Sequence, residues 1–342
     1  MISILAIISV FLIIVILFQV SKIAELVTEV KGEEEAIIRN NNLQANLFII
    51  FLVVGMIAAV WSAIHYSPLF LPASSSAHGA WIENMFFWTW MATIPVFFIT
   101  HVLLFWFVYK YKGQPGKLAY YFSHSNKLEI LWTSVPAAVM IALVVVGMNN
   151  WYKITGTAPD DAVVIEATGM QFKWDLRYAG KDNVLGKKSV RLISDANPFG
   201  QDWEDQGNMD DFLADTLHLP LNKPVLMRIN ALDVLHSFYL AHFSVKMDAV
   251  PGIPTQFWFV PTKTTRQMRE ELNNPEFNYE LACAELCGSA HYNMRKVVVV
   301  DTEEDFNKWL AAQSPISTMF GPNAKTAENT TADTTQTNIT SL

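Results

Sequence analysis

The hydrophobic residues of this chain are concentrated in its N-terminal part, in four long runs without a charged side chain. The runs cover Ile2–Val20, Leu43–Tyr66, Met85–Tyr109 and Ile130–Met148. A helix rising 1.5 Å per residue needs about 20 apolar residues to cross the hydrocarbon core of a bilayer. One such run could be a buried helix of a soluble core, but four in succession favour membrane spans.

The charges between the runs predict the orientation of the spans. The segment from Lys110 to Lys127 contains four lysines and no acidic residue, so the loop 111–128 is expected to be cytoplasmic. The stretch Ser67–Trp81 has no Lys or Arg and is expected to be external. The loop 21–42 carries both signs, and since mainly Lys and Arg count, we place it inside too. Both termini then face outward.

The first run could instead be a secretory signal peptide. It lacks a positively charged segment before the apolar run, and no A-x-A-like cleavage site precedes Lys22. The sequence therefore favours a retained span over residues 1–20, with the signal-like segment as the alternative.

The pattern changes after Asn149, where short stretches of β-forming residues alternate with turns rich in Pro, Gly and Asn. These stretches are Ala162–Thr168, Val225–Ala231, Gln256–Val260, Tyr279–Cys283 and Lys296–Asp301. Many short strands with turn signals between them predict an all-β sandwich or barrel.

One amphipathic helix is predicted after the last strand. It starts at Thr302, whose hydroxyl can accept a hydrogen bond from the Asp305 amide, and runs to about Ala312. From Ser314 to Leu342 the chain is rich in Thr, Asn, Ala and Ser, with little to bury, so this tail is predicted to be disordered.

Composition excludes several classes of protein. Of the 342 residues, 51% are hydrophobic and only 16% charged, which is typical of a chain that is partly in a membrane. The content of 22 Phe, 11 Trp and 10 Tyr is too high for a disordered chain. Two cysteines are too few for a disulfide-built domain. A net charge of −8 argues against nucleic-acid binding, which requires a basic surface.

The candidate chemistry lies around the two cysteines. Cys283 and Cys287 are separated by three residues, and His291 and Met294 follow closely; His236 lies on an earlier apolar strand. Thiolate, imidazole and thioether together select a soft or borderline metal, copper before magnesium or calcium. Two thiolates on one short loop can bridge two metal ions, and a His with one further ligand can complete each ion.

Two simpler interpretations compete with a dinuclear site. In an external domain, Cys283 and Cys287 could form a disulfide. A disulfide has no use for three additional soft-metal ligands, so their presence favours a metal centre. A mononuclear blue-copper site is the other alternative, but it needs one cysteine and not two.

At these residues the chain resembles subunit II of the haem–copper cytochrome c oxidases. The matching motifs are Cys-x-Glu-x-Cys-Gly-Ser-x-His-x-x-Met at 283–294, Asp-Val-Leu-His-Ser at 233–237 and Val-Lys-Met-Asp-Ala-Val-Pro-Gly at 245–252. Residues 128–136 are also similar to the start of the family's second transmembrane helix. The resemblance covers roughly residues 83–312.

The resemblance implies a fold: a membrane α-helical N-terminal region followed by an all-β, cupredoxin-like (Greek-key) extracytoplasmic domain over residues 150–313. The family's two transmembrane helices would be residues 83–110 and 129–149. The spans 1–20 and 43–66 and the loop 21–42 are additional, and residues 314–342 would form the tail. The implied location is a bacterial-type plasma (inner) membrane, multi-pass, with the C-terminal domain on the periplasmic side.

The resemblance also implies a ligand set for a dinuclear copper centre of the CuA type. Two sulfurs would bridge the coppers, two imidazoles and a thioether would complete them, and a backbone carbonyl would be the sixth ligand; the residues are Cys283, Cys287, His236, His291, Met294 and Glu285. In the family the Glu285 carboxylate also points towards a magnesium or manganese ion shared with the catalytic subunit. Taken alone, Glu285 would be a solvated loop acid.

The function implied is that of the subunit at which electrons enter a respiratory, proton-translocating cytochrome c oxidase. A cytochrome c-type donor would reduce the copper centre, and the haem-bearing catalytic subunit would receive the electrons and reduce oxygen to water. The six candidate ligands suggest no open, substrate-accessible position, so the subunit is expected to relay electrons and not to bind oxygen. The partners would be the other oxidase subunits, the donor and the lipid bilayer, with no nucleic acid.

Two further sites follow from the resemblance. Phe172 and Trp174 lie in a segment, 169–178, similar to the family's aromatic region below which electrons enter; the family usually has Trp where this chain has Phe172. The alternative is that both are core aromatics. Glu129, at the cytoplasmic end of the last span, matches a position at the mouth of a proton channel, whereas an acid there is ordinarily an interfacial solvated group.

Several features depart from the family. Seven acids and no Lys or Arg lie between Asp195 and Asp215, which predicts either a solvated loop or an acidic face that steers a basic cytochrome. The interval around Thr264–Pro275 is extended and is expected to form a surface loop. The chain contains no Cys-x-x-Cys-His motif, so it carries no covalently attached haem c.

Two other functions remain as alternatives. Subunit II of a quinol oxidase shares the fold but lacks the copper ligands, so the complete set here argues against it. A membrane-anchored copper chaperone or thiol oxidoreductase could use the cysteine pair, but such proteins are expected on a thioredoxin-like α/β domain, whereas this soluble half is rich in strands.

Overall fold

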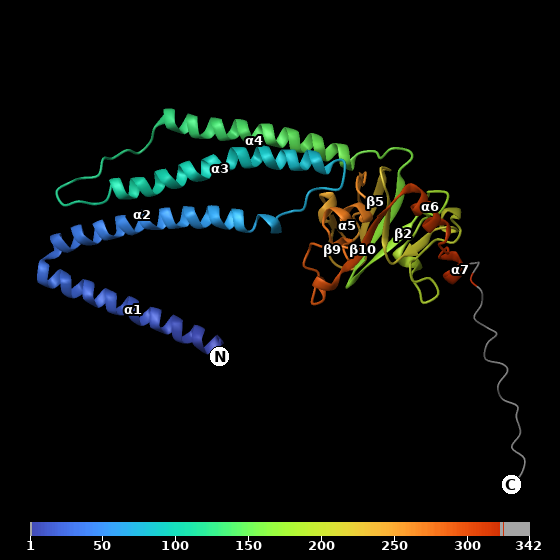
Figure 1. Ribbon diagram of the computed structural model, residues 1–342, viewed down its shortest axis with the longest axis horizontal. Helices are drawn as coiled ribbons and strands as arrows, with labels where there is room; N and C mark the ends of the chain where they lie inside the picture. The colour runs from blue at the N-terminus through green and yellow to red at the C-terminus, as the bar shows by residue number, and fades with distance from the viewer. Residues whose placement is uncertain (1, 322–323, 325–342) are drawn as a thin grey trace, which may run out of the picture. The chain divides into compact units, whose positions relative to one another are not determined.

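The structure is a computed structural model that describes residues 2–321 and residue 324. The chain divides into two compact units (Figure 1). One consists of Met1–Phe70 and Phe87–Ile141, and the other consists of Leu71–Phe86 and Ala142–Leu342. The first unit is helical, and the second contains all of the β-structure.

Four long helices correspond to the four predicted spans. They are α1 (Ile2–Lys31), α2 (Glu33–His65), α3 (Gly79–Lys110) and α4 (Asn126–Thr155). Each is long and apolar enough to cross a membrane. The prediction of a loop over residues 21–42 was wrong. This segment is helical on both sides of a single break at Gly32, which has φ +84°. Its residues are mostly good helix formers, and a polar sequence alone does not end a helix.

The additional helix α2 packs against α3 within the helical unit. The Phe105 ring lies 5.9 Å from the Phe48 ring and 5.7 Å from the Phe51 ring, measured between centroids. The side-chain amide of Asn41 donates a 2.9 Å hydrogen bond to the Gly113 carbonyl. The second helix is therefore attached to one of the two spans expected from the family resemblance.

Ten strands form two five-stranded sheets in the second unit. The first sheet has the order β3-β2-β1-β5-β8 and contains β1 (Val163–Met170), β2 (Lys173–Tyr178), β3 (Phe212–Ala214), β5 (Val225–Ala231) and β8 (Thr255–Phe259). The second has the order β4-β10-β9-β6-β7 and contains β4 (Leu217–Pro220), β6 (His236–Leu240), β7 (Val245–Ala249), β9 (Tyr279–Cys283) and β10 (Arg295–Asp301). Neighbours that are not consecutive in the chain, such as β1 and β5, require crossovers of the kind found in Greek-key sandwiches.

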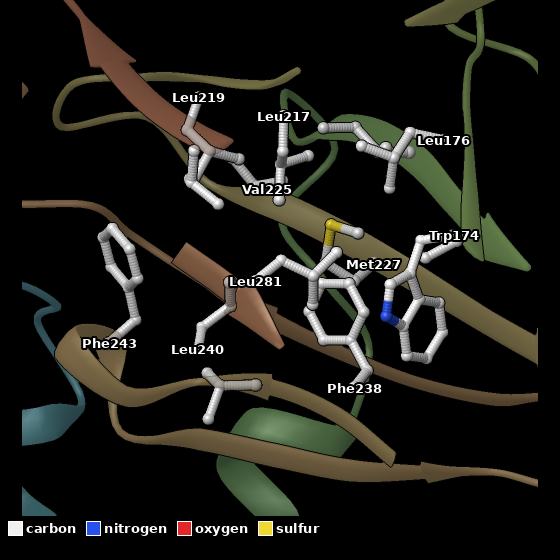
Figure 2. Packing of buried hydrophobic residues seen from close by; sticks show 14 of the residues in the cluster. Trp174, Leu176, Leu217, Leu219, Val225, Met227, Phe238, Leu240, Phe243 and Leu281 are labelled. Atoms are coloured by element: carbon white, nitrogen blue, oxygen red, sulfur yellow. The ribbon is translucent and has the colours of Figure 1, made fainter. Parts of the chain in front are cut away.

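The core consists of alternate residues of both sheets. On β5 the buried positions are Val225, Met227 and Ile229, and on β6 they include Phe238 and Leu240, all with no exposed surface. Figure 2 shows how these large apolar side chains fill the space between the strands. Each buried side chain of this size contributes about 1.5–3 kcal/mol to stability, so the core holds the strands in register.

The predicted strands agree with this unit, whereas one prediction for its connections was wrong. Helix α6 (Glu303–Ala311) begins as expected, with the Thr302 hydroxyl accepting from the Asp305 amide at 3.2 Å. The predicted surface loop at 264–275 instead contains a helix, α5 (Thr265–Glu271). Thr264 and Gln267 form a capping box, and Met268 is buried.

The predicted disordered tail begins too early. Residues 317–320 form a short helix, α7 (Ser317–Phe320), preceded by the fully buried Ile316. The Ser317 hydroxyl donates to the Met209 carbonyl at 2.7 Å. The remainder of the predicted tail, residues 322, 323 and 325–342, lies outside the described residues.

The segment before α3 is built into the β-unit. The Ala77 amide donates to the Val260 carbonyl, the Thr262 amide donates to the Ser75 carbonyl, and the Ser76 hydroxyl donates to the Phe243 carbonyl. The connection between α2 and α3 therefore lies on the same side of a membrane as the β-unit. This placement supports the prediction that both are external.

A buried ion network holds the long β2–β3 connection, which contains most of the acidic segment. The Glu166 carboxylate accepts from Arg177 Nε at 2.9 Å and from Lys188 Nζ at 2.7 Å. Arg177 Nη1 lies 3.0 Å from Asp211 Oδ2, and the Asp211 side chain has no exposed surface. Of the seven acids between 195 and 215, three are exposed: Asp195, Glu204 and Asp215. Much of the acidic segment therefore has a structural role, and the steering idea rests on a smaller charge.

Replacing Asp211 with Ala should weaken this attachment. The substitution removes one of the two carboxylates of a buried guanidinium, so we expect the free energy of unfolding of the β-unit to fall by about 3 kcal/mol. Denaturant unfolding of the detergent-solubilised full chain, followed by near-UV circular dichroism, measures the change. Asp215→Ala is the control, since that side chain is fully exposed. Equal unfolding midpoints for the two variants would contradict the role given to Asp211.

Candidate metal centre

The pairing of β6 with β9 brings the predicted ligands together. His236 is the first residue of β6 and has no exposed surface, and Cys283 is the last residue of β9. Phe238 on β6 lies opposite Cys283, and the Ala284 amide donates to the Ser237 carbonyl at 3.0 Å. The β9–β10 connection is closed by the Cys283 amide, which donates to the Met294 carbonyl. Residues 284–293 between them form a short loop, which we call the ligand loop.

The predicted ligand atoms converge at one end of the second sheet. His236, Cys283 and Cys287 each offer an atom within 4.8 Å of the others. The two sulfurs have further predicted ligands nearby: Cys283 Sγ lies 3.9 Å from His236 Nδ1 and 3.2 Å from the Glu285 carbonyl, and Cys287 Sγ lies 3.6 Å from His291 Nδ1 and 3.3 Å from Met294 Sδ. All six predicted ligands therefore belong to one cluster. Both cysteines are free, so the disulfide alternative is not what the structure shows.

The chemistry of this donor set fits a soft cation. Burial, together with the adjacent Cys283, raises the pKa of the Cys287 thiol to about 11. Two neighbouring thiolates in this site therefore require a positive charge beside them, which a bound metal supplies. Sulfur and imidazole ligands match copper better than the hard ions magnesium and calcium.

His236 is held by a carboxylate on its other side. His236 Nε2 lies 2.9 Å from Asp233 Oδ1. Burial alone would raise the pKa of Asp233, but hydrogen bonds from the Gln171 amide, the His236 ring and the Val234 amide lower it. An ionised Asp233 accepts a hydrogen bond from Nε2–H, which keeps the proton on Nε2 and leaves the Nδ1 lone pair for a metal, the usual arrangement around a metal-binding histidine.

Gly169 makes room for the His236 ring. A Cβ atom at position 169 would lie 2.9 Å from His236 Cδ2, closer than such atoms approach, and 3.0 Å from Trp174 Cζ3, which is also a very tight contact. The Trp174 and His236 rings are in edge contact, with centroids 6.0 Å apart. The buried imidazole therefore packs against Gly169 and the Trp174 ring of the first sheet.

Comparison with known proteins agrees with this site. Residues 163–301 match the family profile "Cytochrome C oxidase subunit II, periplasmic domain", and residues 66–149 match "Cytochrome C oxidase subunit II, transmembrane domain". The chain is 38% identical over 246 residues to "Alternative cytochrome c oxidase subunit 2" of Bradyrhizobium diazoefficiens, which covers 70% of this chain and 82% of the relative. This chain belongs to the cytochrome c oxidase subunit II family.

Two further similarities lie within the same family. Over 257 residues the chain is 29% identical to "Cytochrome c oxidase subunit 2" of Cereibacter sphaeroides, covering 72% of this chain and 78% of that one. The solved periplasmic domain of subunit II (CoxB) of Bradyrhizobium japonicum is 26% identical, with a TM-score of 0.31, and covers 45% of this chain and 95% of that one. The match of residues 163–301 to the periplasmic-domain profile, together with the two five-stranded sheets, makes the β-unit the cupredoxin-like domain of a subunit II, and the thioredoxin-like alternative is wrong.

Membership of this family implies a copper centre and a place in a membrane-bound oxidoreductase complex. It also argues against a quinol-oxidase subunit, because the relatives reported above are subunits of cytochrome c oxidases and this chain has the complete set of candidate copper ligands. The C-terminal domain of the family lies outside the membrane, in agreement with the predicted orientation.

The two predicted aromatic residues lie in different surroundings. Trp174 is 1% exposed and belongs to the core below His236, so it cannot meet a donor at the surface. Phe172 is half-buried and lies over the ligand loop: a Cβ at Gly288 would be 2.8 Å from two atoms of the Phe172 ring. Phe172 therefore lies against the ligand loop at Gly288, the residue that follows Cys287 in the chain.

The two predicted acids have separate positions. The Glu285 carbonyl is part of the cluster, but its side chain is exposed, and no described residue supports a magnesium or manganese ion there. Glu129 lies in the helical unit, where Oε1 accepts from the Ser125 amide at 3.2 Å and caps the start of α4. This contact gives Glu129 a structural role, and the proton-channel role stays a prediction.

Sequence reasoning missed four residues that support the ligands: Gly169, Gln171, Asp233 and Gly288. Asp233 and Gly288 lie inside motifs that carried the family resemblance, and Gly169 and Gln171 lie in the similar segment 169–178, so the signal was present. Their roles depend on contacts between loops far apart in the sequence, and spacing alone does not reveal such contacts.

Gly169→Ala should disturb the metal site without unfolding the domain. The added methyl group must displace the His236 ring or the Trp174 ring, so we expect copper to be held at least about tenfold less tightly, as for other changes next to a metal ligand. Copper retained against a chelator by the purified full chain measures the loss. Gly55→Ala is the control, since a methyl group there meets no atom within 4 Å. Unchanged copper retention in Gly169→Ala would show that the imidazole position is not critical.

Proposed function

We propose that this subunit holds a dinuclear copper centre of the CuA type and relays electrons from a cytochrome c-type donor to the haem-bearing catalytic subunit, which reduces oxygen to water. The observation that carries the proposal is the convergence of two free thiols, two imidazoles, a thioether and a carbonyl, which come from the start of β6, the end of β9 and the segment 284–294. A bound copper pair supplies a redox couple in which one electron is shared between two metals.

The chain offers ligands in two groups around the two sulfurs. Cys283 has His236 and the Glu285 carbonyl beside it, and Cys287 has His291 and Met294 beside it. These residues would hold a copper pair through two thiolates, two imidazoles, a thioether and a carbonyl. With every donor used in this way, no position remains for oxygen, which supports a relay and not an oxygen-reducing site.

The rigidity of the surroundings suits electron transfer. His236 and Met294 are buried, Asp233 holds the outer imidazole nitrogen, and strands β6, β9 and β10 pair side by side. Ligands held by packing and by hydrogen bonds move little when the charge of the metal changes. The protein therefore keeps the cost of reorganisation low and tunes the potential through burial.

Electrons would enter through Phe172. Its ring is half-buried and lies against Gly288, the residue that follows Cys287 in the ligand loop. Exposed apolar side chains of the same loop, Leu286 and Tyr292, offer contact area for a partner protein. The exposed acids Asp195, Glu204 and Asp215 could add steering of a basic donor, which would depend on salt.

The remaining roles rest on the family resemblance alone. The exposed Glu285 carboxylate would face a magnesium or manganese ion shared with the catalytic subunit. Glu129 would lie at the mouth of a proton channel, at the cytoplasmic end of α4. The chain would cross a bacterial plasma membrane with all four helices, and the additional helices α1 and α2 would contact lipid or partner subunits.

Phe172→Ala tests the path of the electrons. We expect reduction of the copper centre by a reduced cytochrome c-type donor, followed by stopped-flow absorption, to slow severalfold, because the side chain between donor and loop is lost. Copper content and spectrum should stay unchanged, since Phe172 is not a ligand. Phe199→Ala, a half-buried phenylalanine of the β2–β3 connection, is the control. Wild-type reduction rates in Phe172→Ala would remove this residue from the path.

A further inference from the structure

Gln171 makes two hydrogen bonds in opposite directions at the edge of the metal centre. It lies in the turn between β1 and β2, directly before Phe172. Its backbone amide donates to Asp233 Oδ2 at 2.7 Å. Its side-chain Nε2 donates to the Cys287 carbonyl at 2.6 Å.

These two contacts join parts of the site that are otherwise far apart in the sequence. The other oxygen of Asp233 holds His236 Nε2 at 2.9 Å, so the backbone of Gln171 is connected to the ligand of β6. The side chain of Gln171 is connected to Cys287 in the ligand loop, 116 positions away in the chain. One residue of the first sheet therefore fixes the distance between a histidine ligand and a cysteine ligand of the second.

The Cys287 carbonyl, which accepts the side-chain hydrogen bond, is followed by a residue with an unusual backbone conformation. Gly288 has φ +142°, a conformation that other residues rarely adopt, and Phe172 leaves no space for a side chain there. A loop that turns on a glycine has little intrinsic preference for one conformation. A strong donor at the Cys287 carbonyl selects the orientation of this peptide and with it the direction of the Cys287 side chain.

From these contacts we infer that Gln171 is a positioning residue for the copper centre, which holds the ligand loop in register with His236 through the Cys287 carbonyl. The inference rests on the proposed function, since it concerns the same ligands. The carboxamide is well suited to this role because it donates at Nε2 without carrying charge. A glutamate of the same size would place an acceptor against the carbonyl oxygen, and a leucine would offer no donor at all.

A simpler role is also open to this residue. Gln171 is exposed, so it could serve only as a contact for the electron donor. A docking contact would change the rate of electron transfer from the donor but would leave the metal centre itself unaltered. Readouts of the centre and of the loop without any donor therefore separate the two roles.

The test compares Gln171→Leu and Gln171→Glu with Gln256→Leu in the purified full chain. Gln256 is an exposed glutamine on β8 with no side-chain hydrogen bond among the described residues, so it is a matched control. We expect both Gln171 variants to retain copper about tenfold less tightly against a chelator, the usual loss for a residue behind a metal ligand. Their copper hyperfine couplings in electron paramagnetic resonance should also differ from wild type. Gln256→Leu should match wild type in both measurements.

A second measurement needs no metal. In the metal-free full chain, amide hydrogen exchange in the ligand loop should be faster in both Gln171 variants, while exchange in β5 and β9 stays at the wild-type rate, which shows that the domain is folded. Wild-type copper retention, spectrum and loop exchange in both variants would overturn the inference. If the wild-type protein itself held no copper pair, the proposed function would fail, and the exchange comparison would still decide whether Gln171 positions the loop.

Discussion

Two cysteine sulfurs beside a buried imidazole place the strongest constraint on this molecule. Burial and the second thiol raise the pKa of Cys287, so the pair cannot carry its charges without a cation. Strand pairing in the β-sandwich brings these groups together: His236 is fully buried at the start of β6, and Cys283 lies opposite Phe238 of β6. The metal site is therefore a property of the fold and not of one flexible loop.

The contacts around the ligands extend this constraint to the other sheet. Gly169, Gln171 and Trp174 all come from β1, β2 or the turn between them, and each touches or supports a ligand of the second sheet. The two sheets thus contribute differently: the second sheet carries the ligands, and the first determines where they lie. This division explains how a surface residue such as Phe172 comes to lie directly over the ligand loop.

The sequence allowed much of this to be predicted. The four apolar runs predicted the long helices because length and hydrophobicity are sufficient evidence for a helix that could span a membrane. The motifs at 233–237 and 283–294 pointed to candidate ligands because a soft metal such as copper selects those side chains. The break at Gly32, the capping box at Thr264 and the buried Ile316 were not predicted. Around Gly32 the polar stretch consists mostly of good helix formers. At Thr264 a capping box stabilises a helix, and at Ile316 burial and the Ser317 hydrogen bond do so.

The supporting residues were harder to predict for a different reason. Asp233, Gln171 and Gly288 are near one another only after β6 has paired with β9 and the two sheets have packed together, so nothing in their spacing indicates their roles. The acidic segment is a similar case, because Asp211 is an interior partner of Arg177 and contributes no charge to the surface. Composition gives the number of acids in such a segment, but only the fold shows which of them are exposed to a partner protein.

The most direct test of this account is a copper count per chain combined with electron paramagnetic resonance of the purified, copper-loaded protein. The account predicts two copper atoms per chain and a hyperfine pattern from one unpaired electron shared equally by two copper nuclei. A single copper atom with the pattern of an isolated ion, or a chain without copper whose two sulfurs are joined as a disulfide, would contradict it.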